Sequence, residues 1–310
     1  MAYVPPPPGS TAPGQPTPEG VAKQSVHITD LPPEVRKNFL MSMIFFPSMV
    51  GAAICAVMFL GWVTIFKPKE PAQYALELGS SDMRRRWTAA RELSEHIAQY
   101  GETQNTRIYS PDVLSALIQI LENPDLDRQT SAWSPSGALR QDDEKGSLRS
   151  WAARTIGHIG ARMTQASERE RAFNALTKAL EEKELTHVAA RGLAYMYDVR
   201  ASDALIKHLN EDPDSGNRCA CAEALGAIGW GAMQAKEGTE SADKIRLALK
   251  HAYDLENAKP KRDEDVLDNV AISLARVKDS SALNRLQALE KHADPSVRDQ
   301  ARRALDILEK

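Results

Sequence analysis

One helical pattern recurs six times between residues 71 and 310, and this repetition limits the folds open to the chain more than any other feature. Each copy has Ala, Cys or Val three positions after its first residue, Ala four positions after it in most copies, and Leu or Ile seven positions after it. These positions share one face of an α-helix, and small residues there let a second helix pack closely. The first residues of the six copies are Arg86, Arg149, Thr186, Arg218, Leu267 and Arg298.

Each copy is preceded by another segment with apolar residues at helical spacing, as in residues 113–121. Ser110-Pro111 and Asp294-Pro295 each place a capping side chain directly before a proline, which is typical of a helix start. No segment alternates with a period of two, so no sheet is predicted. A single helical hairpin cannot bury its apolar faces alone, whereas stacked hairpins can. The sequence therefore predicts an all-α solenoid of about six hairpins.

Two intervals between copies are longer than one hairpin needs. They predict insertions near 122–146 and 230–243, and both stretches are rich in Gly, Ser and charged residues, as loops are.

The segments SLRSWAARTIGHIG, NRCACAEALGAIG and PSVRDQARRAL resemble the second helices of HEAT-like repeats of the phycobilisome-lyase type. The resemblance implies a right-handed α-solenoid whose surfaces bind other proteins. It also implies that an arginine near the start of each second helix links neighbouring repeats. The matching residues are Arg86, Arg149, Arg218 and Arg298, while Thr186 and Leu267 depart from the pattern and predict a gap in this arginine ladder.

Residues 39–66 contain no charged residue, and a bilayer-spanning helix needs roughly 20 apolar residues. The stretch lies between Arg36 and Lys37 on one side and Lys67 and Lys69 on the other. These features predict a single transmembrane helix and hence a single-pass membrane protein. Small residues at four-residue spacing indicate packing against another membrane helix, although small residues are common in such spans. They are Ser48, Gly51, Ala52, Cys55 and Ala56.

Residues 1–38 are rich in proline and poor in apolar residues, which predicts a disordered tail. The run Pro5 to Pro8 leaves open a polyproline ligand for an aromatic groove. Lysine and arginine are more numerous on the repeat side of the apolar stretch, so the repeat domain is expected in the cytoplasm. The unpaired Cys219 and Cys221 point the same way.

Several kinds of chemistry find no support in the sequence. The net charge is −3 with acids and bases interspersed, so nucleic acid is not an expected partner. No phosphate-binding glycine loop, nucleophile elbow or metal-ligand spacing occurs, so we expect no cofactor, metal, catalytic residue or small-molecule substrate. Cys219 as a reactive or chromophore-bearing thiol stays open beside its more ordinary interpretation as a helix residue.

Two features are candidates for partner binding. Trp133 lies in a polar loop, where it either packs back on the solenoid or is presented to a partner. Arg84 and Arg85 begin a helix close in sequence to the apolar stretch, where they either contact anionic lipid headgroups or are simply solvated.

These observations predict a membrane-anchored scaffold that docks or recruits proteins of a membrane complex and is not an enzyme. The alternative is a chromophore lyase-like enzyme or enzyme accessory, because some members of the resembled family attach or remove a linear tetrapyrrole on a client protein. A subunit held mainly through its apolar helix is a third possibility.

Overall fold

The fold is that of a computed structural model, which describes residues 32–65, 69–100, 108–126, 147–235 and 239–309. All regular elements in these ranges are helices. The chain divides into two compact units, Met1–Pro68 and Lys69–Lys310. Each unit is described by itself.

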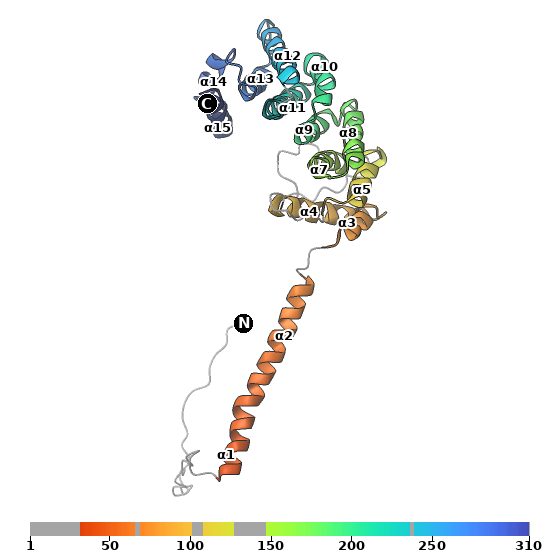
Figure 1. Ribbon diagram of the computed structural model, residues 1–310, viewed down its shortest axis with the longest axis vertical. Coiled ribbons are helices and arrows are strands. Elements are labelled where there is room, and N and C mark those ends of the chain that lie inside the picture. The colour runs from red at the N-terminus through yellow and green to blue at the C-terminus, as the bar shows by residue number, and fades with distance from the viewer. Residues whose placement is uncertain (1–31, 66–68, 101–107, 127–146, 236–238, 310) are drawn as a thin grey trace, which may run out of the picture. The chain divides into compact units, whose positions relative to one another are not determined.

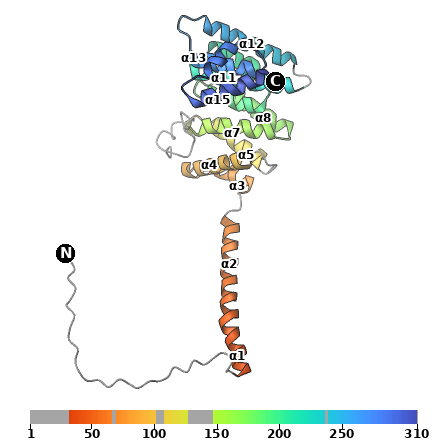
Figure 2. The same ribbon diagram turned by 90° about the vertical axis from the view of Figure 1, so that its left-hand side faces the viewer.

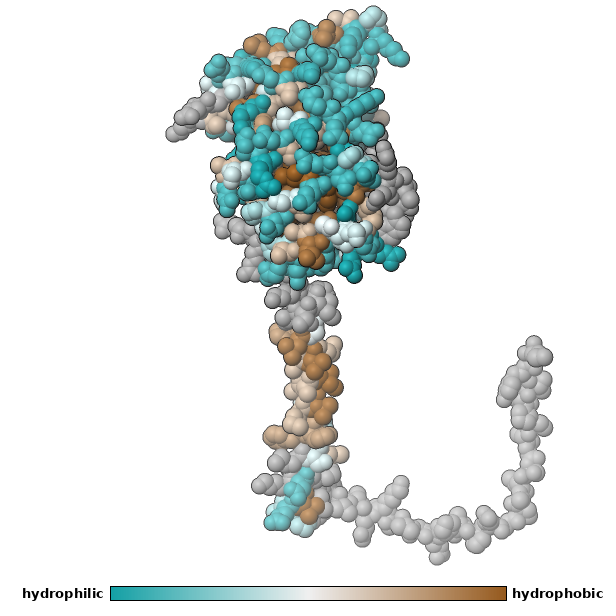
Figure 3. All heavy atoms as spheres, turned by 90° about the vertical axis from the view of Figure 1, so that its right-hand side faces the viewer, coloured by the Kyte–Doolittle hydropathy of each residue, from teal (hydrophilic) through white to brown (hydrophobic). Residues whose placement is uncertain are grey.

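The first unit contains α1 (Pro33–Leu40), a short π-helical stretch, η2 (Met41–Phe45), and α2 (Phe46–Ile65). Large apolar side chains of α2, such as Met58 and Phe59, are exposed. Figure 3 shows this helix as a hydrophobic column, whereas the visible face of the repeat unit is mostly hydrophilic.

Among the described residues, no helix is both long and apolar enough to cross a membrane. This finding contradicts the single-pass membrane localisation predicted from residues 39–66, together with the cytoplasmic placement of the repeat domain. The predicted packing against another membrane helix depended on this span. The residues to which it applied are Ser48, Gly51, Ala52, Cys55 and Ala56.

The second unit consists of stacked helical hairpins, and this confirms the predicted helical solenoid (Figures 1 and 2). In each hairpin the second helix carries the repeated pattern. The pairs are α3 (Pro71–Leu78) with α4 (Met83–Tyr100), α5 (Pro111–Leu121) with α7 (Leu148–Arg162), α8 (Ala166–Leu180) with α9 (Thr186–Met196), α10 (Ser202–Glu211) with α11 (Ser215–Gln234), α12 (Thr239–Asn257) with α13 (Glu264–Arg276), and α14 (Leu283–Leu289) with α15 (Pro295–Glu309).

The second helices contact one another in chain order, from α4 through α7, α9, α11 and α13 to α15. They line the inner side of the curve, and α8, α10 and α12 lie on its outer side (Figure 1). Helix α9 contacts both α7 and α11, and α13 contacts both α11 and α15. Stacking is therefore continuous at the two repeats that begin with Thr186 and Leu267.

The repeated small and apolar residues form the core between the helices. In α7, for example, Ala152, Ala153 and Ile156 are fully buried, as the spacing predicts. Two predicted helix starts are also present: the Ser110 hydroxyl accepts a hydrogen bond from the Val113 N–H at 3.3 Å, and α15 begins at Pro295.

Glycines let some second helices touch backbone to backbone. A Cβ atom at Gly157 of α7 would lie 2.3 Å from the Gly192 carbonyl oxygen of α9. A Cβ atom at Gly226 of α11 would lie 2.8 Å from Ser273 Cβ of α13. Only a hydrogen at these positions permits the crossings, because real Cβ contacts are longer.

One predicted insertion differs from its expected form. Helix α11 continues to Gln234 and α12 begins at Thr239, so most of 230–243 extends two helices instead of forming a loop. Most of the other insertion, residues 127–146, lies outside the described residues, as do residues 1–31 of the predicted tail.

Candidate functional site

The four arginines of the predicted ladder hold the turns of their own hairpins. Each donates a hydrogen bond to a backbone carbonyl at the end of the first helix or in the turn that follows it. The donor–acceptor pairs are Arg86 with Ser80, Arg149 with Leu121 (2.7 Å), Arg218 with Asp212 (2.9 Å) and Arg298 with His292 (2.6 Å).

Two of these arginines also reach the next repeat. The Arg149 guanidinium lies 2.6 Å from a Glu182 carboxylate oxygen, and the Arg218 guanidinium lies 3.3 Å from that of Asp263. Arg149 is only 4% exposed, so its bonds are formed largely out of water. Both arginines thus join neighbouring hairpins, as the resemblance implies for this position.

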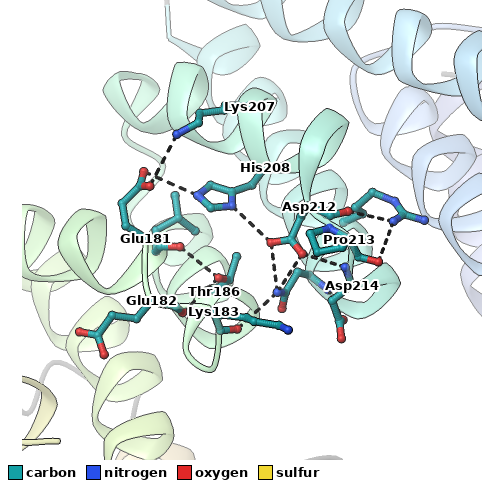
Figure 4. Close-up of polar contacts among 12 residues, drawn as sticks. Glu181, Glu182, Lys183, Thr186, Lys207, His208, Asp212, Pro213 and Asp214 are labelled. Carbon is teal, nitrogen blue, oxygen red and sulfur yellow. Dashed lines mark hydrogen bonds and ion pairs between the residues drawn. The ribbon is translucent and has the colours of Figure 1, made fainter.

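Thr186 occupies the arginine position of the third repeat and bonds the same kind of carbonyl (Figure 4). Its hydroxyl lies 3.1 Å from the carbonyl oxygens of both Leu180 and Glu182. His208 lies between this turn and the turn of the next hairpin. Its Nε2 is 3.6 Å from a Glu181 carboxylate oxygen, and its Nδ1 is 3.4 Å from a carboxylate oxygen of Asp212. This polar cluster ties two hairpin turns together, and we assign it a structural role.

A groove of about 720 Å³ lies on the other side of the second helices, away from the core. Helices α7, α9, α11, α13 and α15 all contribute side chains to its lining. Polar and apolar groups are both present in it. The groove therefore runs along the solenoid and is formed by consecutive repeats.

The repeat register explains which side chains enter the groove. Positions five and nine after the first residue of each copy lie on the helix face opposite the buried positions three, four and seven. Most lining residues occupy these two positions. They are Arg154, Arg191, Tyr195, Glu223, Ala227, Arg276 and Ile307.

Three large aromatic side chains form one wall of the groove. Tyr195, Tyr197 and Trp230 are 39%, 49% and 43% exposed, respectively. The ring centroids of Tyr197 and Trp230 are 6.3 Å apart. A chain with so few aromatic residues thus places three beside one another in contact with solvent.

The backbone fixes the position of Tyr197. This residue caps α9 in the left-handed conformation, with φ 51°, which side chains other than glycine seldom adopt. Its ring then lies on Gly231 of α11, where an added Cβ would come within 2.8 Å of Tyr197 Cδ1. The aromatic wall therefore depends on a glycine in the next repeat.

The imidazole ring of His158 in α7 packs against the ring of Tyr195. The two ring centroids are 3.6 Å apart and the ring planes differ by 30°. Burial, followed by the neighbouring positive charges of Arg162 and Arg154, lowers the pKa of His158 to about 4. His158 is therefore neutral near pH 7 and adds a flat ring, not a charge.

Guanidinium groups supply the charge of the groove. Arg191 Nε lies 3.6 Å from a carboxylate oxygen of Glu223, and both side chains remain about two-fifths exposed, at 41% and 42%. Arg276 donates to the Glu223 backbone carbonyl at 3.4 Å, and Arg154 lines the same space. These groups suit binding of a carboxylate and provide no nucleophile.

The binding residues predicted from sequence lie elsewhere. Trp133 is outside the described residues. Arg84 and Arg85 are exposed at the start of α4, where Arg85 Nε lies 3.8 Å from an Asp82 carboxylate oxygen. Neither arginine lines the groove, and the binding role of all three residues stays a prediction.

The two cysteines of α11 differ from the expectation for a reactive thiol. Burial raises the pKa of Cys219 to about 12 and raises the pKa of Cys221 as well. A thiolate, the nucleophilic form, is therefore disfavoured at both positions near pH 7. Among the described residues, no group of three or more His, Cys, Asp and Glu is placed to hold a metal ion.

Comparison with known proteins identifies the repeat. Residues 148–182, which form α7, α8 and the turn after them, match the PBS lyase HEAT-like repeat family. No curated protein matches the chain.

Solved structures give only distant likenesses. An engineered protein is 21% identical, with 77% of this chain and 68% of that chain covered and a TM-score of 0.36. The complex of CpcE and CpcF of phycocyanin lyase from Nostoc sp. is 22% identical, with 78% and 94% covered and a TM-score of 0.37. Human deoxyhypusine hydroxylase is 13% identical, with 80% and 99% covered and a TM-score of 0.35. At such scores none of these likenesses indicates a function. The family match thus covers residues 148–182, within a unit of stacked helical hairpins.

Proposed function

We propose that this protein is a scaffold that binds a partner polypeptide along the groove of its second helices and catalyses no reaction itself. The aromatic wall of Tyr195, Tyr197 and Trp230 carries the proposal. These side chains are large, held in place and in contact with solvent. Tyrosine, tryptophan and arginine are also the residues that contribute most to binding energy at protein interfaces.

The architecture supports the same proposal. A solenoid exposes an extended inner surface to which each repeat contributes similar positions, and repeat proteins use such surfaces for partners. Partner side chains that cover the wall would remove apolar area from water, at about 25 cal/mol per Å². The raised pKa of Cys219 favours binding over thiol chemistry as the role of this unit.

Site-specific photo-crosslinking tests the proposal. A benzoylphenylalanine residue replaces Tyr195 or Trp230 in the full chain, expressed in the cells of its source, and crosslinked proteins are identified by mass spectrometry. The matched control positions are Lys207 and Lys250, which are exposed on the first helices α10 and α12. We expect the same partner at both groove positions and not at the controls. Crosslinks shared equally by groove and control positions would contradict the proposal, as would their complete absence.

Trp133 is one of the sequence-derived candidates for contact with the partner. We propose that a Trp133→Ala change weakens binding of the crosslinked partner without unfolding the repeat unit. Unchanged affinity would remove the loop from the binding surface.

A further inference from the structure

The charge of the groove differs from that of the chain as a whole. Positions five and nine after the first residue of each copy carry five arginines, namely Arg91, Arg154, Arg191, Arg276 and Arg303. Only two carboxylates, Glu95 and Glu223, occupy these positions, although the chain carries a net charge of −3. At these positions the inner face of the second helices therefore carries more basic than acidic residues.

We infer that the groove selects an acidic polypeptide segment, whose carboxylates pair with Arg154, Arg191 and Arg276 while its apolar side chains cover the aromatic wall. This inference rests on the proposed function and names the chemistry of the partner. Guanidinium groups bind carboxylates through two parallel hydrogen bonds, which a flat arginine can offer from a helix face.

Glu223 marks where a partner carboxylate would lie. Its carboxylate is 3.6 Å from Arg191 Nε, which is longer than a normal charged hydrogen bond, and it stays partly exposed. Such a pair is weak in water and exchanges readily. A carboxylate of the partner can therefore replace Glu223 as the ion-pair partner of Arg191. The negative charge of Glu223 repels that carboxylate and so opposes its binding.

This relation predicts two variants with opposite effects. Arg191→Glu combined with Arg276→Glu reverses two charges of the groove and should weaken binding of an acidic segment by about ten-fold or more. Glu223→Gln removes the competing charge and should strengthen binding by about two- to five-fold. A gain in affinity is the sharper result, because a residue needed only for folding would not produce it.

Fluorescence anisotropy with the full-length protein provides the measurement. The probe is a fluorescein-labelled copolymer of glutamate and tyrosine, and the charge-reversed probe is a copolymer of lysine and tyrosine. A labelled oligouridylate represents nucleic acid, the other class of anion that aromatic rings and arginines bind. Circular dichroism establishes that each variant is folded.

The matched control is Arg171→Glu combined with Arg246→Glu, which makes the same charge change on first helices α8 and α12. We expect this control to bind the acidic copolymer within about two-fold of the unchanged protein, because these arginines lie outside the groove. Equal loss in the control and groove variants would show non-specific attraction and overturn the inference.

The remaining outcomes are also decisive. Lack of binding to the glutamate–tyrosine copolymer, or equal binding of the lysine–tyrosine copolymer, would overturn the inference. So would tighter binding of oligouridylate with the same dependence on Arg191. Photo-crosslinks from Tyr195 and Trp230 separate the two claims, because a partner captured without any preference for acidic probes leaves the groove a protein-binding site of other chemistry.

Discussion

An arginine at the start of a second helix satisfies a carbonyl that the hairpin turn would otherwise leave without a partner. Arg149 does more than satisfy the Leu121 carbonyl, because it is buried and also contacts Glu182 in the next repeat. Thr186 bonds equivalent carbonyls with a much shorter side chain. The expected gap in the ladder therefore leaves the turn satisfied, and packing of the small residues keeps the stack continuous.

Removal of Arg149 should cost more than removal of Arg298. Arg149→Ala leaves the Leu121 carbonyl without its donor in a buried place, so we expect the free energy of unfolding to fall by about 2–3 kcal/mol. Arg298→Ala exposes its acceptor carbonyls to water, so a loss of about 1 kcal/mol or less is expected. Urea unfolding followed by circular dichroism compares the two variants. Equal losses would contradict this account of the ladder.

His158 should make the repeat unit sensitive to acid. Its pKa is lowered from 6.5 to about 4, so between these values the folded state binds fewer protons than the unfolded state. Stability is therefore full above pH 6.5 and declines as the pH falls towards 4. Urea midpoints measured across this range should decline less steeply in His158→Gln. His251→Gln, at an exposed position of α12, is the control and should keep the slope of the unchanged protein.

Sequence reasoning predicted the buried residues of the repeat and missed the groove. Ala152, Ala153 and Ile156 follow from spacing alone, because a helix face repeats every three to four residues. The same register, read at positions five and nine, would have placed Arg191 and Tyr195 on the opposite face. Tyr197 could not be placed this way, since its direction depends on a left-handed backbone that no spacing encodes.

At the scale of helices, close crossings set the distance between repeats. Gly157 against Gly192 and Gly226 against Ser273 bring successive second helices into direct contact. Gly157 and Gly226 both stand eight residues after the first residue of their copies, but the contact partner comes from the neighbouring hairpin. The helical extension through 230–234 was missed for another reason. Glycine and charge suggested a loop, whereas Ala, Met and Gln in the same stretch favour a helix.

Gly157→Ala tests the crossing of α7 and α9. Alanine is a better helix former than glycine by about 1 kcal/mol, so the change would stabilise a helix with free space around this position. Here the added Cβ would lie 2.3 Å from the Gly192 carbonyl oxygen, and the helices must separate. We expect net destabilisation of about 1–3 kcal/mol by urea unfolding. Gly79→Ala is the control, because its added Cβ meets nothing closer than 3.4 Å. A more stable Gly157→Ala protein would contradict the described packing.

At the scale of the whole chain, each hairpin of the repeat unit contacts mainly its neighbours. A change at one interface should therefore destabilise the adjoining hairpins more than distant ones. The handedness of the superhelix stays a prediction of the resemblance. The membrane localisation illustrates the limit of hydropathy as a guide. An uncharged stretch predicted a span, yet no helix among the described residues is long and apolar enough to be one. The partner contacts of Trp133, Arg84 and Arg85 likewise stay predictions.

Hydrogen exchange should reveal this local stability. In Gly157→Ala we expect faster amide exchange in α7 and α9, because their shared interface is weakened. Exchange in α14 and α15, which do not adjoin this interface, should stay close to that of the unchanged protein. Uniformly faster exchange from α3 to α15 would show that the solenoid unfolds as one cooperative body.

The central claim is that a partner binds through the aromatic wall of the groove, and the affinity of the crosslinked partner for purified variants tests it most directly. Tyr195→Ala combined with Trp230→Ala removes two of the three rings, whereas Leu247→Ala combined with Leu255→Ala removes exposed apolar side chains from α12. We predict that the first pair weakens binding by about ten-fold or more and that the second leaves it unchanged. Equal affinity of the unchanged protein and the Tyr195 and Trp230 variant would contradict the account.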